Sequence, residues 1–100
     1  MNAHSALRTA RQYHQAGRLA EAEAGYQLVL ATDPNDPNAL NLLGALYLQT
    51  ARDEEALDLL RRAVKRLPAF PEAFNNLGVA LEARRELRDA EDGASKAATV

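Results

Sequence analysis

The chain has no cysteine and no tryptophan, and only two of its 100 residues are histidine. The absence of cysteine excludes a disulfide framework, a thiol nucleophile and a cysteine metal site. No apolar run approaches the ~18 residues that a membrane-spanning helix needs. The first seventeen residues also lack the apolar stretch of a signal peptide. We therefore expect a cytoplasmic protein without a membrane partner.

Charge and composition narrow the class of protein further. Twelve basic and 14 acidic residues give a net charge of -2, whereas nucleic-acid-binding domains usually carry an excess of basic residues. A hydrophobic content of 47% with 26% charged residues is ordinary for a globular protein. One hundred residues suit one domain, and no linker rich in Gly, Ser or Pro divides them. The sequence predicts a single domain over residues 1–100 that does not bind nucleic acid.

The same pattern of residues returns every 34 positions. Ala6, Leu40 and Phe74 correspond to one another in this register. Small residues coincide at two further places in each unit, namely Ala10, Gly44 and Gly78, and then Ala22, Ala56 and Ala90. A fixed period in this range indicates an architecture of stacked repeats. We place the repeats near residues 3–36, 37–70 and 71–100.

Each repeat is predicted to be a hairpin of two helices. Apolar residues fall at i, i+3, i+4 and i+7, the spacing of one helix face. Gly17 is expected to end the first helix, and Asp53 to cap the fourth. Gly44 and Ala56 are expected to pack together where two helices cross. The predicted helices cover residues 4–16, 19–31, 37–50, 53–66, 71–84 and 87–98.

These residues carry a resemblance to a known family. The pattern Leu43-Gly44 followed by Tyr47, with Ala56, Ala63 and Pro68, resembles the tetratricopeptide repeat. The third unit departs from the family pattern in its second half, where large apolar residues are replaced by alanine. The resemblance implies an all-α, right-handed solenoid of three antiparallel helix-turn-helix repeats. It also implies that the first helices of the units line a concave face.

No set of residues predicts catalysis. His4 and His14 stand ten residues apart on one predicted helix, about 15 Å at 1.5 Å per residue, too far to share a metal. Both are expected to be solvated surface residues. The glycines are scattered through helical pattern and form no phosphate-binding loop. We expect no catalytic residue, no metal, no cofactor and no enzymatic activity within the chain.

Binding is expected on the concave face, where residues not needed for packing converge. Arginine can hold a carboxylate through two parallel hydrogen bonds, and asparagine can pair with the backbone of an extended peptide. The alternative is that the asparagines merely solvate the groove. The predicted peptide-binding residues are Arg8, Arg11, Gln15, Asn38, Asn41, Leu42, Leu48, Asn75 and Asn76.

Three functions remain open at this stage. The first is a non-catalytic scaffold that binds a protein or peptide partner in the groove. The second is the N-terminal recognition module of a larger enzyme, such as a protein-modifying transferase. The third is self-assembly into a homo-oligomer through the C-terminal hairpin. The third rests on the small apolar residues that end the chain: Ala94, Ala97, Ala98 and Val100.

A run of basic residues lies late in the fourth predicted helix: Arg61, Arg62, Lys65 and Arg66. Cations at the end of a helix complement its macrodipole, and this is the preferred interpretation. The alternative is a patch for phosphate or for an acidic partner.

Overall fold

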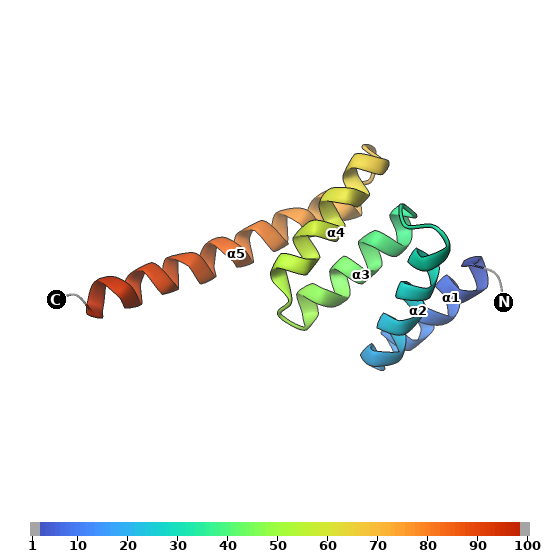
Figure 1. Ribbon diagram of the computed structural model, residues 1–100, viewed down its shortest axis with the longest axis horizontal. Coiled ribbons are helices and arrows are strands. Elements are labelled where there is room, and N and C mark those ends of the chain that lie inside the picture. Colours follow the sequence, from blue (N-terminus) through green and yellow to red (C-terminus); the bar gives the residue numbers. More distant parts are fainter. Residues whose placement is uncertain (1–2, 99–100) are drawn as a thin grey trace.

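The computed structural model describes the backbone of residues 3–98 and the side chains of residues 4–92. This part of the chain consists of five α-helices and contains no strand. The helices run one after another as a stack, with both chain ends at opposite extremes of an elongated molecule (Figure 1). This confirms the predicted all-α repeat solenoid. The helices are α1 (Ala3–Gln15), α2 (Leu19–Thr32), α3 (Pro37–Gln49), α4 (Asp53–Arg66) and α5 (Pro71–Ala98).

Two tight turns make the first two hairpins. Gly17 turns the chain between α1 and α2 with a positive φ of 79°, a conformation that costs glycine nothing. Ala51 occupies the same place between α3 and α4 with a φ of 58°. In each turn the residue after the one with positive φ donates its backbone N–H to the carbonyl five positions earlier: Arg18 to Tyr13 and Arg52 to Tyr47. The second turn is therefore made without glycine, as the sequence predicts.

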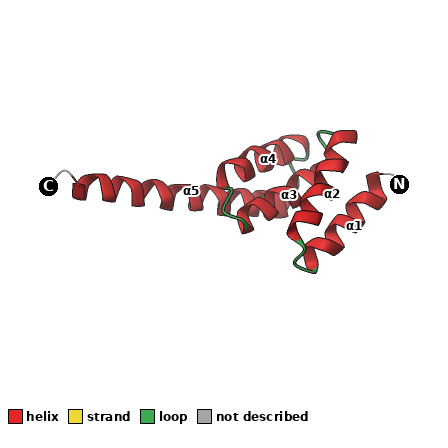
Figure 2. Ribbon diagram, turned by 60° about the horizontal axis from the view of Figure 1, so that its bottom comes forward, coloured by secondary structure: helices red, strands yellow, loops and turns green. Residues whose placement is uncertain are grey.

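The predicted third hairpin is not present. Residues 71–98 form a single helix of 28 residues, so the predicted break between residues 84 and 87 is wrong. Arg85 stands in register with Gly17 and Ala51 but continues the helix. Arginine and glutamate favour helix, and the segment beyond them offers mainly alanine for burial. The C-terminal half of α5 therefore projects away from the stack (Figures 1 and 2).

The missing second helix leaves one face of α5 open. Phe74 and Leu81 are 48% and 44% exposed. A Cβ added to Gly78 would meet no atom within 4 Å, whereas a Cβ on Gly44 would lie 2.8 Å from Leu60. The three heavy atoms nearest to that Cβ all belong to Leu60, and the expected packing of Gly44 against Ala56 stays a prediction. The apolar side chains expected to end the hairpin, Ala94, Ala97, Ala98 and Val100, lie outside the described residues.

The core lies between the four helices of the two complete hairpins and the start of α5. Asp36 caps α3, because its carboxylate accepts the backbone N–H of Ala39 at 2.9 Å. Asp53 is not the cap of α4. That position belongs to Arg52, which makes no side-chain capping bond, and Asp53 lies in the first turn. The largest fully buried side chains are Tyr26, Leu40, Leu46, Leu57 and Leu60.

Candidate functional site

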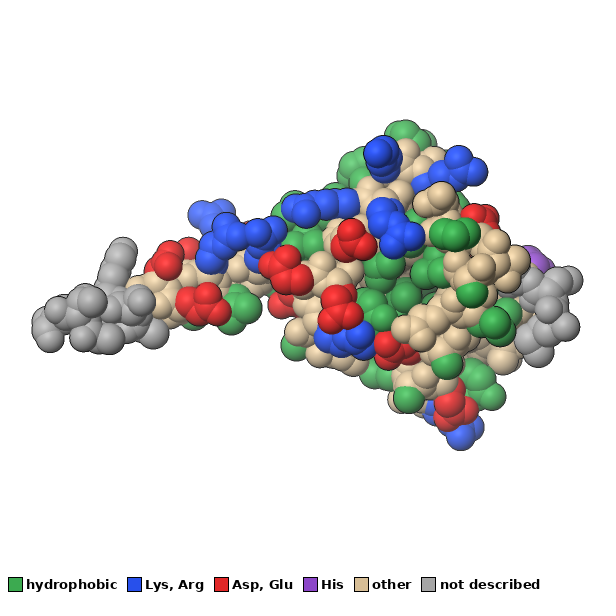
Figure 3. Space-filling model, viewed as in Figure 1, with side chains coloured by type: hydrophobic (Ala, Val, Ile, Leu, Met, Phe, Trp, Pro, Cys, Tyr) green, Lys and Arg blue, Asp and Glu red, His purple; other side chains and the backbone are tan. Residues whose placement is uncertain are grey.

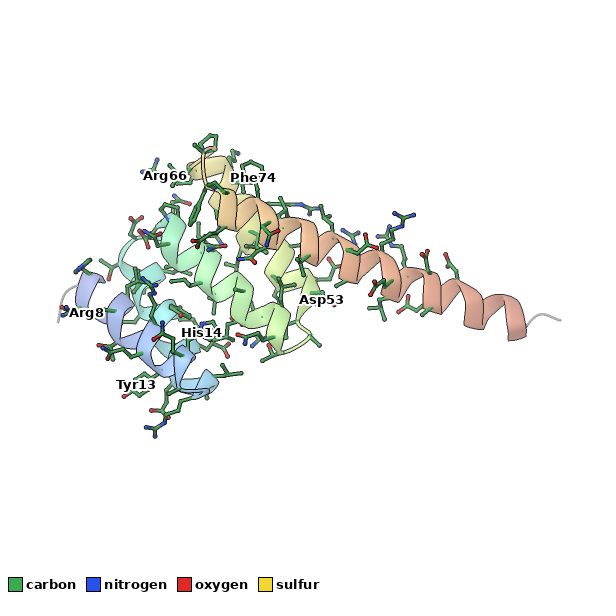
Figure 4. The ribbon with its side chains drawn as sticks, turned by 180° about the vertical axis from the view of Figure 1, so that it is seen from behind. Arg8, Tyr13, His14, Asp53, Arg66 and Phe74 are labelled. Carbon is green, nitrogen blue, oxygen red and sulfur yellow. The ribbon has the colours of Figure 1, made fainter. Side chains whose placement is uncertain are left out.

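Four of the predicted binding residues meet at two adjoining hollows on α1 and its neighbours. One hollow of about 210 Å³ is lined by Arg11, His14, Gln15, Tyr26 and Leu42. Arg11 and Gln15 also line a second hollow of about 250 Å³. Arg8 lies on α1, seen from the side opposite to Figure 1, and belongs to this second hollow (Figure 4). The second hollow is completed by His4, Leu7 and Gln12.

The side chain of His14 is hydrogen-bonded to two other helices and is not the solvated surface histidine that we predicted. Its Nδ1 lies 2.9 Å from the Tyr26 hydroxyl, and its Nε2 contacts Oε1 of Gln49. The amide oxygen of Gln49 can only accept, so in the neutral ring Nε2 donates and Nδ1 accepts from Tyr26. The ring also stands edge-on to Tyr26 at 71°. His14 thereby joins α1 to both α2 and α3.

The repeat register contains a signal that His14 is half-buried. Position 14 corresponds to Leu48 in the second unit, and Leu48 packs against the core. An apolar residue at the equivalent place indicates a half-buried position. A histidine there needs partners for its ring nitrogens, and sequence spacing alone did not reveal Gln49 as one of them.

Burial keeps the Tyr26 hydroxyl protonated. Desolvation raises the pKa of the phenol above its usual value, and the charge of Arg11 opposes this only in part. A protonated phenol can donate to His14, which agrees with the tautomer assigned above. The floor of the smaller hollow is therefore held by a fixed hydrogen-bond chain from Tyr26 through His14 to Gln49.

The asparagines of the predicted groove divide into two kinds. Asn41 is only 3% exposed, and its Oδ1 accepts a hydrogen bond of 2.9 Å from Nδ2 of the half-buried Asn76. Asn38 and Asn75 are exposed on α3 and α5. Leu42 and Leu48 are partly buried and pack against the core.

A second polar cluster, which the sequence did not predict, joins the first two repeats. Arg52 forms ion pairs with Glu23 at 2.9 Å and with Glu55 at 2.6 Å. Its guanidinium carbon lies 3.9 Å from the ring centroid of Tyr47, close enough for a cation–π interaction. The Tyr47 hydroxyl donates to Glu23 at 3.0 Å. The cluster fixes α2 against α3 and α4.

Ionisation in this cluster follows from those contacts. Hydrogen bonds from Arg52 hold the pKa of the Glu55 carboxyl below its usual range, and the same bonds raise the pKa of Arg52. Burial raises the pKa of Tyr47. Tyr47, Arg52 and Glu55 therefore keep their usual charges at neutral pH, which fits a cluster that stabilises the interface.

Among the side chains that the structure describes, no three His, Cys, Asp or Glu residues are grouped so that they could hold a metal ion. None of the helices in the described part of the chain is long and apolar enough to cross a bilayer.

Comparison with known proteins identifies relatives of the same architecture. A family model described as tetratricopeptide repeat matches residues 13–77. A Caenorhabditis elegans protein named UDP-N-acetylglucosamine--peptide N-acetylglucosaminyltransferase is 35% identical over 81 residues, which is 81% of this chain. An Arabidopsis thaliana protein named CTR9 homolog is 36% identical over 62 residues, 62% of the chain. The matches span 7% and 6% of the lengths of these two proteins.

Two solved structures share the fold at lower identity. The second tetratricopeptide domain of Spaghetti (RPAP3), bound to the HSP90 peptide SRMEEVD, aligns with a TM-score of 0.80 and 21% identity. The alignment covers 90% of this chain and 83% of that one. A tetratricopeptide domain from Salinibacter ruber aligns with a TM-score of 0.69 and 20% identity, over 83% of this chain and 97% of that one.

Proposed function

We propose that this chain, which belongs to the tetratricopeptide repeat family, is a non-catalytic scaffold that binds an extended protein segment along α1, α3 and α5. The observation that carries the proposal is the convergence of Arg8, Arg11, Gln15 and Leu42 around two adjoining hollows. Residues 1–100 would act as one binding domain without a cofactor. A cytoplasmic location is proposed with it, because the chain has no cysteine to form disulfides.

The preferred segment carries acidic residues or a free C-terminal carboxylate. Arg8 and Arg11 are exposed one turn apart on α1, so one carboxylate can reach both. Leu42 offers an apolar contact in the hollow that Arg11 also lines. The peptide bound by the structural neighbour, SRMEEVD, has this character in its last four residues, which supports the choice of ligand.

The asparagines then contact the backbone of the bound segment. Asn38 and Asn75 are exposed and can offer both donor and acceptor groups. Asn76 already donates to Asn41, so its Oδ1 is the atom that could accept an N–H of the segment. Asn41 acts through Asn76 and does not itself contact the ligand. Leu48 would extend the apolar contact made by Leu42.

A peptide library tests this proposal without a known partner. The chain is challenged with random peptides that have either a free or an amidated C-terminus, and the retained peptides are sequenced. Acidic peptides and free carboxylates should be enriched, and the preference for a free over an amidated C-terminus should disappear for the Arg8→Ala/Arg11→Ala variant. Enrichment of peptides without either feature, or a preference for free C-termini that survives the double substitution, would place the binding site elsewhere.

A second candidate is that the chain is the recognition module of a larger enzyme. The match to a named glycosyltransferase at 35% identity favours it, although the match spans 7% of that protein. In this case the groove would select the segment to be modified and the chemistry would lie outside these residues. The discriminating observation is whether the reading frame that encodes this chain also encodes a catalytic domain.

A third candidate, self-association through α5, is favoured by the open apolar face of that helix. Phe74 and Leu81 lie seven residues apart on this face, and both are exposed. Light scattering over a hundredfold range of concentration tests it. Association should raise the measured mass, and Phe74→Gln/Leu81→Gln should restore the monomer mass. A monomer at every concentration would rule this candidate out.

A further inference from the structure

A third hollow, of about 440 Å³, lies away from the groove and is lined by Asn35, Arg62, Lys65 and Arg66. It is formed by the loop between α2 and α3 and by the last two turns of α4. Lys and Arg side chains gather over this end of α4 on the face shown in Figure 3. No lining residue is acidic. We propose that this α4 hollow binds a protein segment rich in Asp and Glu.

One of the cations, Arg62, is held in place before any ligand arrives. Arg62 donates to the backbone carbonyl of Pro34 at 2.7 Å, so its guanidinium is fixed against the loop. The loop is itself constrained, because Asp33 accepts the backbone N–H of Asn35 at 3.2 Å. Fixing a side chain in advance lowers the entropy lost on binding.

The lining of the hollow is cationic, although acidic residues lie around it. Asp58 approaches Arg62 at 3.6 Å and neutralises part of its charge. Asp33 and Asp36 lie in the neighbouring loop, where their carboxylates accept the backbone N–H groups of Asn35 and Ala39. Lys65 and Arg66 are both exposed. The lining itself therefore carries three positive side chains and no negative one.

The repeat itself shows that helix α4 does not need these cations in order to end. The residues of α2 in register with Arg61, Arg62, Lys65 and Arg66 are Gln27, Leu28, Ala31 and Thr32. The last turn of α2 contains no basic residue, yet α2 and α4 have the same length of 14 residues. Compensation of the helix macrodipole is thus not a requirement of the fold at this position.

The geometry points to a ligand with several carboxylates. The positive groups lie between positions 62 and 66 of α4, about 6 Å along the helix axis at 1.5 Å per residue. A single exposed ion pair is weak and is screened by salt. Several pairs formed together by one acidic segment are needed for useful affinity, and the open shape of the hollow gives such a segment access.

Fluorescence anisotropy with a labelled peptide of six glutamates, capped at both ends, tests the inference. The capped peptide has no terminal carboxylate, and six glutamines provide the neutral control. Lys65→Gln/Arg66→Gln should weaken binding of the glutamate peptide at least tenfold. The matched control, Arg85→Gln/Arg88→Gln, removes the same charge from exposed positions on α5 and should change the affinity less than twofold. The helical circular dichroism of both variants verifies that they are folded.

Equal losses in the two double variants would show attraction to overall charge and would overturn the proposal. So would an absence of saturable binding, or equal binding of the glutamine peptide. Arg8→Ala/Arg11→Ala removes the cations of the groove, and in this background Lys65→Gln/Arg66→Gln should still weaken binding of the capped glutamate peptide at least tenfold. This variant separates the α4 hollow from the groove, because either site can fail while the other remains.

Discussion

The side-chain amide of Asn76 donates a hydrogen bond of 2.9 Å to the side-chain oxygen of Asn41, and this bond joins α5 to α3. Asn41 is 3% exposed, so it has little access to water as an alternative partner. The pair connects the long helix to the second hairpin at the proposed groove. Two residues that the sequence assigned to ligand binding therefore also have a structural role.

Replacing Asn76 by alanine should lower the free energy of unfolding. The substitution leaves the buried oxygen of Asn41 unpaired, which costs about 1–3 kcal/mol. The neighbouring Asn75 is exposed, and Asn75→Ala should change the stability by no more than about 0.5 kcal/mol. Urea denaturation of both variants provides the comparison. Equal stabilities would mean that the hydrogen bond contributes nothing in solution.

Two glycines should respond in opposite directions to the same substitution. A Cβ on Gly25 would lie 2.6 Å from Cβ of Ala10, an atom that cannot rotate away. Gly25→Ala should therefore cost about 1–3 kcal/mol through overpacking. A Cβ on Gly78 meets nothing within 4 Å, so Gly78→Ala should stabilise the helix by up to about 1 kcal/mol.

Thermal unfolding measures both glycine variants. A destabilised Gly78→Ala protein would contradict the open face of α5, because it would imply that another helix packs there. If Gly25→Ala lowers the stability and Gly78→Ala has no effect, the close approach of α1 and α2 is supported. Only the expected gain from helix propensity at position 78 would then be wrong.

Large apolar residues at the same position of the second and third repeats should contribute differently to stability. Leu40 is fully buried, and Leu40→Ala should cost about 2–5 kcal/mol. Phe74 holds the equivalent position in α5 but is 48% exposed. Phe74→Ala should therefore cost well under the ~3–5 kcal/mol expected for a buried phenylalanine. A loss in that range, measured in urea, would show that a second helix covers α5.

The ion pair of Arg52 and Glu55 should make stability depend on pH at the acidic end. The folded pKa of Glu55 is lowered by hydrogen bonds from Arg52. Its contribution is therefore fully present above the ordinary value of about 4.3 and is lost as the pH falls through the lowered folded value. The melting temperature of Glu55→Gln should lie below that of the unsubstituted protein at pH 7, and the two should converge in strong acid.

Glu91→Gln provides the control for this titration, because Glu91 is exposed on the projecting part of α5. Its melting temperature should follow that of the unsubstituted protein at each pH. A difference between the Glu55→Gln and unsubstituted proteins that persists in strong acid would show that the effect does not come from the ionised carboxylate.

Much of the fold follows from local sequence signals. The 34-residue register places Gly17 and Ala51 at the two turns, and the apolar spacing gives α1 to α4 within one residue at each end. The third unit has the same register, but position 85 holds arginine and not glycine. The residues beyond it offer few large apolar side chains for burial, so continuing the helix is more favourable than forming a turn. That competition between local propensity and packing is not visible in periodicity.

The site was predictable only in part for a similar reason. Arg8, Arg11, Gln15 and Leu42 line two adjoining hollows because helix periodicity and the repeat register align them. The partners of His14 and Asn41 come from other helices, at sequence separations that no single helix pattern encodes. Pairings of this kind depend on how the repeats are offset when they stack.

Chemical-shift mapping of the isotope-labelled chain gives the most direct test of the central claim. The ligand is a short peptide that is rich in Asp, contains one Leu and has a free C-terminal carboxylate. The account predicts shifts of the amides of residues 8–15 and of Leu42 and Asn76, and their loss in the Arg8→Ala/Arg11→Ala variant. Shifts confined to α4 or to the projecting part of α5, or shifts of these groove amides that persist in the variant, would contradict binding in the groove.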